Sequence, residues 1–131
     1  MPWSEANRLG VAEMDATHRV FVDLADRLLA ADDAAFPALF AELHAHTRAH
    51  FDNEGRLMKA CRFPAIGEHN GEHLRVLGEL AHFASAVKAG RLAAARQYAQ
   101  NLPSWFATHL ATMDAALAAC LKRAGSPSVR A

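Results

Sequence analysis

The sequence lacks the features that mark several broad classes of protein. It carries no net charge, with 14 Lys and Arg against 14 Asp and Glu, and it shows no basic stripe of the kind found in nucleic-acid binders. No apolar run approaches the roughly 20 residues that span a bilayer, and the first residues form no secretory signal. Two cysteines are too few for a disulfide framework. We therefore expect a soluble, cytoplasmic protein that binds neither nucleic acid nor membrane.

Histidine is the residue type that stands out among those present. The chain has 131 residues and a 52% apolar content, which suffices for one domain with its own core and is too apolar for disorder. It contains eight histidines but a single tyrosine. Because histidine is the commonest metal ligand and titrates near neutral pH, the positions of these histidines carry the most functional information.

Apolar residues recur every three or four positions along four stretches, the spacing of helices with one buried face. Alanine and leucine dominate and β-branched residues are few, which also favours helix. We predict an all-α, up-down-up-down four-helix bundle, because the connections between the stretches are short. The chain, 1–131, is predicted to form a single domain with helices over 12–31, 35–61, 66–89 and 92–122 and flexible arms at both ends.

A few residues predict where the helices begin and end. Asp15 is a candidate N-cap for the first helix, and Asp32 with Asp33 can cap the second. Gly90 suits the position just beyond the third helix. Pro103 lies inside the fourth stretch and predicts either a kink or a later helix start.

Ionisable residues occupy core-facing positions in all four predicted helices. Burying such groups without partners would cost several kcal/mol each. Two pairs are spaced by four residues and therefore share a helix face. At 1.5 Å per residue, the histidines of all four helices lie roughly 18 to 26 Å from the same end of the bundle, so they can meet in one layer. The residues are His18 in the first helix, His50 and Glu54 in the second, His69 and His73 in the third, and His109 in the fourth.

Asp114 follows His109 by five residues. On a regular α-helix this spacing places the two side chains about 140° apart. A local π-bulge would bring them to one face, and such bulges favour functional sites. We therefore predict that Asp114 joins the same layer.

This set of donors suits two metal ions better than one. Imidazole suits iron, copper, zinc and nickel, whereas bridging carboxylates favour iron. Five imidazoles, two bridging carboxylates and a bridging oxo or hydroxo group fill all but one position of two octahedral iron spheres. The vacant position is where a small ligand would bind. The predicted metal ligands are His18, His50, Glu54, His69, His73, His109 and Asp114.

These motifs resemble those of the hemerythrin family, specifically its single-domain bacterial members. The similarity extends from about Trp3 to Leu121. It rests on Asp15-Ala16-Thr17-His18, on His50-Phe51 followed by Glu54 and Leu57-Met58, on His69 with His73, on Trp105 with His109 and Asp114, and on Trp3 and Phe63-Pro64.

The resemblance implies a non-haem di-iron centre that binds O2 reversibly, for storage, delivery or sensing. Imidazole-rich ligation agrees with this function, because it adds little negative charge and so stabilises high-valent iron poorly. The contrasting carboxylate-rich sites use Glu-x-x-His motifs, and this chain has none. The implied arrangement is one iron held by His69, His73 and His109, a second held by His18 and His50 with an open position, and bridges from Glu54 and Asp114.

Four apolar side chains lie within about one helical turn of His18 or His109 and are expected to line the O2 pocket. Ordinary core packing accounts for them equally well, and both roles can hold together. A catalyst would need a proton donor beside the open position, and these side chains offer none. The residues are Phe21, Trp105, Phe106 and Leu110.

The remaining histidines and the cysteines leave alternatives open. His44 and His82 fall off the core stripes and are expected to be solvated. His46 precedes His50 by one turn and is a candidate hydrogen-bond partner for a metal ligand. Cys61 and Cys120 fall near the same end of the bundle, where they can form a disulfide or, as a cytoplasmic location favours, remain free thiols.

We predict a carrier or sensor of O2 rather than an enzyme, and a monomer. One alternative is a di-iron oxidoreductase that scavenges peroxide or nitric oxide at the same site. Another is a redox or O2 signalling module that acts through a protein partner, because 131 residues leave no room for an output domain.

Overall fold

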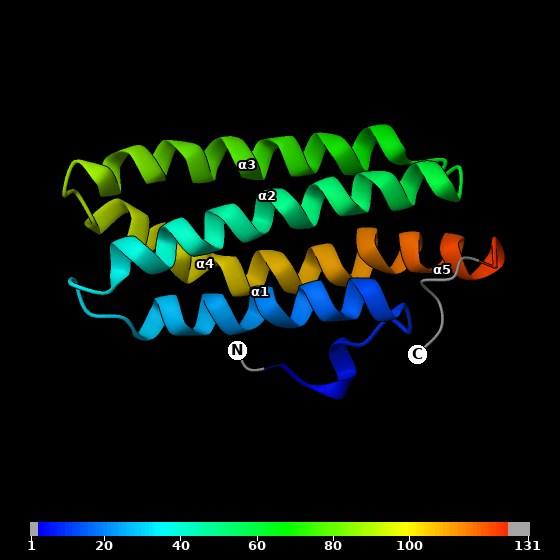
Figure 1. Cartoon of the computed structure of the whole chain (residues 1–131), viewed down its shortest axis with the longest axis horizontal. Helices are drawn as coiled ribbons and strands as arrows, with labels where there is room; N and C mark the ends of the chain where they lie inside the picture. Colours follow the sequence, from blue (N-terminus) through cyan, green and yellow to red (C-terminus); the bar gives the residue numbers. More distant parts are fainter. Residues whose placement is uncertain (1–2, 126–131) are drawn as a thin grey trace.

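Four long helical segments lie side by side along one axis in the computed structural model, which describes residues 3–125 (Figure 1). The described residues contain no strand. A π-helical turn, Leu110–Asp114, joins the last two helices into one segment. The helices are α1 (Ala12–Ala30), α2 (Phe36–Ala60), α3 (Ile66–Lys88), α4 (Ala93–His109) and α5 (Ala115–Arg123).

The arrangement confirms the predicted all-α, up-down-up-down bundle. Successive helical segments run in opposite directions, with α1 packed against α2 and α4, and α3 packed against α2 and α4 (Figure 1). Each observed helix end lies within one residue of the end expected from the sequence. The fourth predicted helix, 92–122, corresponds to α4, the π-helical turn and α5 together.

The prediction that Asp15 is the N-cap of the first helix is wrong. Helix α1 begins at Ala12, so Asp15 lies inside its first turn. The Asp15 carboxylate accepts hydrogen bonds from the backbone N–H groups of Leu9 at 2.8 Å and Gly10 at 3.1 Å. Asp15 therefore fixes the chain that enters the helix rather than capping the helix itself.

The segment before α1, which we expected to form a flexible arm, packs against the bundle. One 3₁₀ turn covers Glu5–Asn7, and Trp3 and Leu9 pack against the core. At the other end, Ala124 and Gly125 form a turn after α5. The rest of the predicted C-terminal arm, 126–131, and residues 1–2 lie outside the described residues.

The other residues that were predicted to mark helix ends do so only in part. Asp32 accepts a hydrogen bond from the N–H of Ala35, just before α2, at 2.9 Å. Asp33 instead pairs with Arg96 of α4 at 2.7 Å. Gly90 adopts a φ of 80° after α3, the left-handed conformation that favours glycine. Pro103 lies within α4, which begins at Ala93, so the proline does not delay the helix start.

The apolar core consists of two clusters. The larger cluster lies towards the end where α1 joins α2 and includes Phe36, Phe40 and Leu80. The smaller one lies towards the opposite end and includes Met14 and Met58. Along the helices, the buried histidines and carboxylates fall between these clusters, so the core is interrupted by one polar layer. No helix in the described part of the chain is long and apolar enough to span a membrane.

Alanine substitutions at two glycines should shift stability in opposite directions. A Cβ added at Gly78 or at Gly90 meets nothing within 4 Å, so only the backbone conformation distinguishes the two sites. Gly78→Ala in α3 should stabilise by about 0.5–1 kcal/mol, because alanine is the better helix former. Gly90→Ala should destabilise by about 1 kcal/mol, because alanine disfavours positive φ. Urea unfolding of both variants measures this, and shifts of the same sign would contradict the assigned backbone conformations.

Candidate metal centre

All seven residues that the sequence singles out meet in one buried layer of the bundle. None of their side chains is more than 5% exposed. His18 comes from α1, His50 and Glu54 from α2, His69 and His73 from α3, and His109 from α4, while Asp114 ends the π-helical turn.

The π-helical turn is what brings Asp114 into the layer. Leu110–Asp114 adopts π-helix directly after α4, which confirms the bulge predicted from the five-residue spacing. Asp114 Oδ1 consequently lies 3.2 Å from His109 Nε2. A regular helix would direct the carboxylate about 140° away from that imidazole.

Glu54 lies between two groups of imidazoles. Its Oε2 is 2.7 Å from His50 Nε2 and 3.0 Å from His18 Nε2. Its Oε1 is 3.3 Å from the Nε2 atoms of His69 and His73. Each oxygen of this carboxylate therefore faces a different group of histidines.

The two oxygens of the Asp114 carboxylate also face different groups of histidines. Its Oδ2 is 3.2 Å from His18 Nε2, and its Oδ1 is 3.2 Å from the Nε2 atoms of His69 and His109. Both carboxylates thus direct one oxygen towards the His18 side and the other towards the side of His69. This is the arrangement that two bridging carboxylates require.

Several buried donor atoms at the centre of the layer have no hydrogen-bond partner among the described residues. They include Nε2 of His69, His73 and His109, although carboxylate oxygens lie within 3.3 Å of each. Such orphaned atoms are rare in protein interiors and call for an explanation. A metal ion supplies one, because it accepts lone pairs from imidazole nitrogens and carboxylate oxygens together.

The donor atoms form two overlapping groups, each with its ligand atoms within 4.8 Å of one another. The chemistry of both groups, neutral imidazole and carboxylate, fits iron. The cluster is therefore suited to a di-iron site. One group contains Glu54, His69, His73, His109 and Asp114, and the other contains His18, His50 and Glu54.

Charge within the layer favours ionised carboxylates. Burial alone would raise the pKa of Glu54, but the charge of His50 and the hydrogen bond from His18 hold that pKa well below its usual value. Burial and the charge of Glu54 would raise the pKa of Asp114, but the adjacent imidazoles of His109 and His18 hold it below its usual value.

The pKa values of two imidazoles are raised rather than lowered. Burial lowers the pKa of His18, but the adjacent carboxylates of Asp114 and Glu54 outweigh it and raise the pKa to about 9. For His69 too, burial lowers the pKa, but the nearby Asp114 and Glu54 carboxylates outweigh it and raise the pKa to about 9. Both imidazoles are therefore doubly protonated and positively charged at neutral pH when no metal is bound. A metal ion must displace the proton on the ligating nitrogen.

Of the four predicted pocket residues, three are buried near the layer and one is half-buried. Phe106 packs edge-on against His18, with ring centroids 5.5 Å apart, and Phe21 stacks on Phe106 at 5.0 Å. Leu110 is buried directly after His109. Trp105 is half-buried and stacks on His109 at 4.8 Å. Three apolar side chains are thus buried near the layer, while the indole covers one imidazole from outside.

Two contacts of the layer were not predicted from the sequence. The Phe51 ring stacks on His73 with centroids 3.7 Å apart. Trp105 donates its indole N–H to Glu72 at 2.8 Å, which fixes the ring over His109. Phe51 follows His50 directly, and Glu72 precedes His73, but only the relative rotation of the helices brings them to these partners.

His46 does not bond to the ring of a candidate ligand. Its Nε2 lies 3.0 Å from the backbone carbonyl of Thr17, so it links α2 to α1 one residue before His18. Burial lowers the pKa of His46, which suits a neutral ring that donates its N–H to a carbonyl. His82 is exposed as predicted, and His44 is partly exposed.

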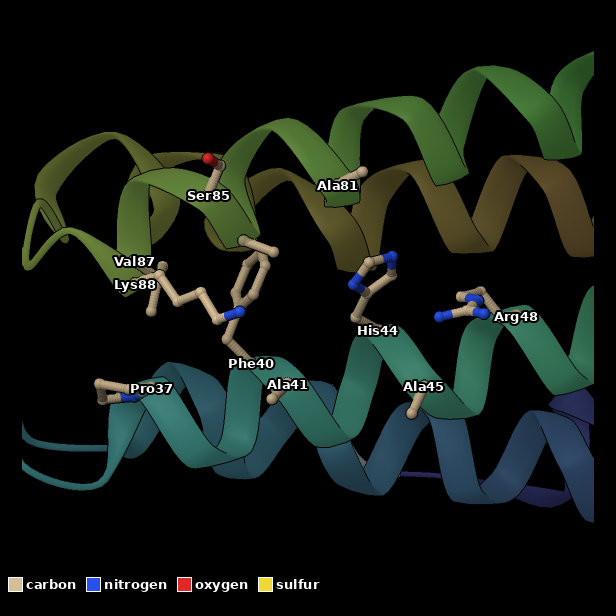
Figure 2. A pocket seen from close by; sticks show the side chains of 11 residues that line it. Pro37, Phe40, Ala41, His44, Ala45, Arg48, Ala81, Ser85, Val87 and Lys88 are labelled. Carbon is tan, nitrogen blue, oxygen red and sulfur yellow. The ribbon is translucent and has the colours of Figure 1, made fainter.

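A surface groove of about 490 Å³ between α2 and α3 lies apart from this layer (Figure 2). Phe40 and His44 extend into it from α2, and Lys88 extends into it from α3 (Figure 2). None of the residues that line the groove belongs to the buried cluster. The candidate functional site is therefore the polar layer inside the bundle.

Comparison with known proteins agrees with this geometry. The family model for the hemerythrin HHE cation binding domain matches residues 9–121. The chain is 35% identical to a bacteriohemerythrin of Ralstonia nicotianae over 123 residues, which cover 94% of this chain and 90% of the relative. A crystal structure of a mutant hemerythrin superposes with a TM-score of 0.84, covering 92% of this chain and 96% of the other, at 20% identity. The latter likeness concerns the fold.

The metal-free protein should lose stability as the pH rises above neutral. The pKa values of His18 and His69 are about 9 in the folded state against 6.5 for a free histidine. The folded state therefore binds more protons than the unfolded state between these values, and the unfolding free energy falls by about 1 kcal/mol per pH unit for each group. Urea unfolding of metal-stripped protein at pH 6.5, 8 and 9 measures this fall.

His18→Gln should weaken this alkaline dependence, whereas His82→Gln, at an exposed position, should leave it unchanged. The lowered pKa of Glu54 predicts a second loss of stability below about pH 4.5. A metal-free protein that gains stability between pH 6.5 and 9 would show that the two imidazoles are not held protonated by the carboxylates.

Proposed function

The chain belongs to the hemerythrin family, and we propose that its buried layer holds two iron ions and binds O2 reversibly, for storage, delivery or sensing. One observation supports this proposal most strongly. Glu54 and Asp114 each direct one oxygen towards His18 and the other towards His69. Two carboxylates arranged in this way fit a pair of metal ions that they bridge.

The proposed ligands are unequally divided between the two ions. His69, His73 and His109 serve one ion, and His18 and His50 serve the other, with both carboxylates shared. A two-iron centre supplies, when bound, the two electrons that reversible O2 binding uses. The ion on the two-histidine side has one protein ligand fewer, so this is where we place the open position for O2.

The side chains near His18 support a carrier more than a catalyst. Phe106 packs against the His18 ring, Phe21 stacks behind it, and Leu110 is buried after His109. None of these buried side chains can donate a proton, and we expect them to keep water away from the layer. General acid catalysis requires a positioned donor, which these residues do not provide.

Trp105 and Glu72 have a positioning role in this proposal. The indole stacks on His109, and its N–H is held by the Glu72 carboxylate. Glu72 is itself paired with Arg75, which lowers the pKa of Glu72 to about 2 and keeps it ionised. The Trp105 ring is thereby held in a fixed orientation, in which it shields the His109 imidazole from solvent.

Purified protein should contain two iron atoms per chain. His69→Ala should lose much of this iron, because it removes an imidazole whose Nε2 faces both carboxylates. His82→Ala is the matched control at an exposed position. Elemental analysis after expression with added iron measures the content. One metal per chain, or zinc in place of iron, would rule out the di-iron proposal.

Reduced protein mixed with O2 in a stopped-flow spectrometer should oxygenate and then return to the colourless reduced form on degassing. Leu110→Asp should accelerate irreversible oxidation at least about tenfold without loss of iron, because it places a charge and water beside the layer. Trp105→Ala should act in the same direction. Leu74→Asp makes the same change at a leucine that is 70% exposed and should have no effect.

The enzyme alternative makes a different prediction in the same experiment. An oxidoreductase would consume hydrogen peroxide or nitric oxide over many turnovers, and its oxygenated form would decay without recovery on degassing. Catalytic consumption of either compound would replace the carrier function proposed here.

A further inference from the structure

The two cysteines of the chain lie next to each other at one end of the bundle. Cys61 directly follows α2, and Cys120 lies in α5, which ends at the same end of the bundle (Figure 1). The Cys120 thiol donates a hydrogen bond to the backbone carbonyl of Cys61, with the sulfur 3.2 Å from the oxygen. Both cysteines are free thiols, Cys120 buried and Cys61 half-buried.

The Cys120 thiol also influences the Cys61 thiol. Burial raises the pKa of Cys61 to about 11, and the adjacent Cys120 thiol contributes to this rise. A thiol is oxidised through its thiolate, so a raised pKa makes the pair slow to react and keeps it reduced under mild conditions. Oxidation therefore requires a sustained supply of oxidant.

This pair links the same two helical segments that carry the carboxylates of the metal centre. Cys61 follows Glu54 by seven residues, and Cys120 follows Asp114 by six. Either interval corresponds to about 10 Å along a helix. The apolar side chains of Met58 and Leu117 belong to the same buried cluster as Cys120. Along the two segments, these residues lie between the carboxylates and the cysteines. The segment that contains α2 and the segment formed by the π-helical turn and α5 thus lie together at the carboxylate layer and again at the cysteines.

We propose that Cys61 and Cys120 form a modification site, at which hydrogen peroxide converts the two thiols into an internal disulfide that keeps α2 and α5 together when the metal is lost. Formation of the disulfide requires only that the two cysteines lie next to each other. The consequence for the metal-free protein rests on the proposed function, because it assumes that Glu54 and Asp114 are held together by bound metal.

The reaction balances without any further reactant. The more accessible Cys61 attacks hydrogen peroxide as its thiolate, the O–O bond breaks, and hydroxide leaves, giving a sulfenic acid. Cys120 then attacks the Cys61 sulfur, the S–S bond forms, and the sulfenic oxygen leaves as water. Two thiols lose two electrons and two protons, and one peroxide becomes two waters.

The first test treats the intact, metal-bound protein with hydrogen peroxide at pH 8.5 and, in parallel, with diamide, a thiol oxidant that does not depend on peroxide. We expect a mass decrease of about 2 Da and a fall in titratable thiols from two to zero. A peptide that joins Cys61 to Cys120 should appear after proteolysis. Cys61→Ser, at the half-buried position, should abolish the mass decrease without disturbing the core.

Three outcomes of this test would overturn the proposal. A covalent dimer on a non-reducing gel would show that the thiols pair between chains. A gain of about 32 Da would show oxidation of a thiol to sulfinic acid instead. Unchanged thiols after diamide treatment, under conditions that fully oxidise dithiothreitol, would show that the two sulfurs cannot reach each other.

The second test compares melting temperatures after metal removal by a chelator. The disulfide closes a loop of about 60 residues, so the oxidised metal-free protein should melt roughly 10 °C above the reduced one, and dithiothreitol should reverse the difference. Cys61→Ser should show no difference between oxidised and reduced samples. Equal melting temperatures for wild-type protein would contradict the linking role. A reduced protein that melts unchanged after metal removal would count against the proposed function, and the mass result would still decide the disulfide.

Discussion

The burial of five imidazoles and two carboxylates in one layer is the constraint on which the rest of this structure depends. Each of these groups would cost several kcal/mol to bury without a partner. The two apolar clusters on either side supply the hydrophobic stabilisation, whereas several polar atoms of the layer between them have no hydrogen-bond partner among the described residues. A pair of metal ions would supply those partners, so the residues that interrupt the apolar core are also those of the proposed metal centre.

The geometry of the layer comes from three simple helical spacings. His50 and Glu54, like His69 and His73, are four residues apart and face inward together. His109 and Asp114 are five apart, which a regular α-helix cannot accommodate on one face. The π-helical turn corrects this mismatch and lets α5 continue along the bundle beyond Asp114.

The sequence predicts those features that depend on position along a single helix. The helix spans, the inward-facing pairs and the π-helical turn at Leu110–Asp114 all follow from periodicity. Features that depend on how two segments meet do not follow from it. The Asp15 carboxylate binds the N–H groups of Leu9 and Gly10 because of the path of the preceding chain. Stacking of Phe51 on His73 depends on the rotation of α2 against α3.

Anomalous X-ray diffraction at the iron absorption edge, from a crystal of the iron-loaded protein, tests the central claim most directly. The account predicts two iron peaks within the buried layer, one beside His69, His73 and His109 and the other beside His18 and His50. Glu54 and Asp114 should each contact both. A single peak, or peaks outside this layer, would contradict the assignment of a two-metal centre bridged by the two carboxylates.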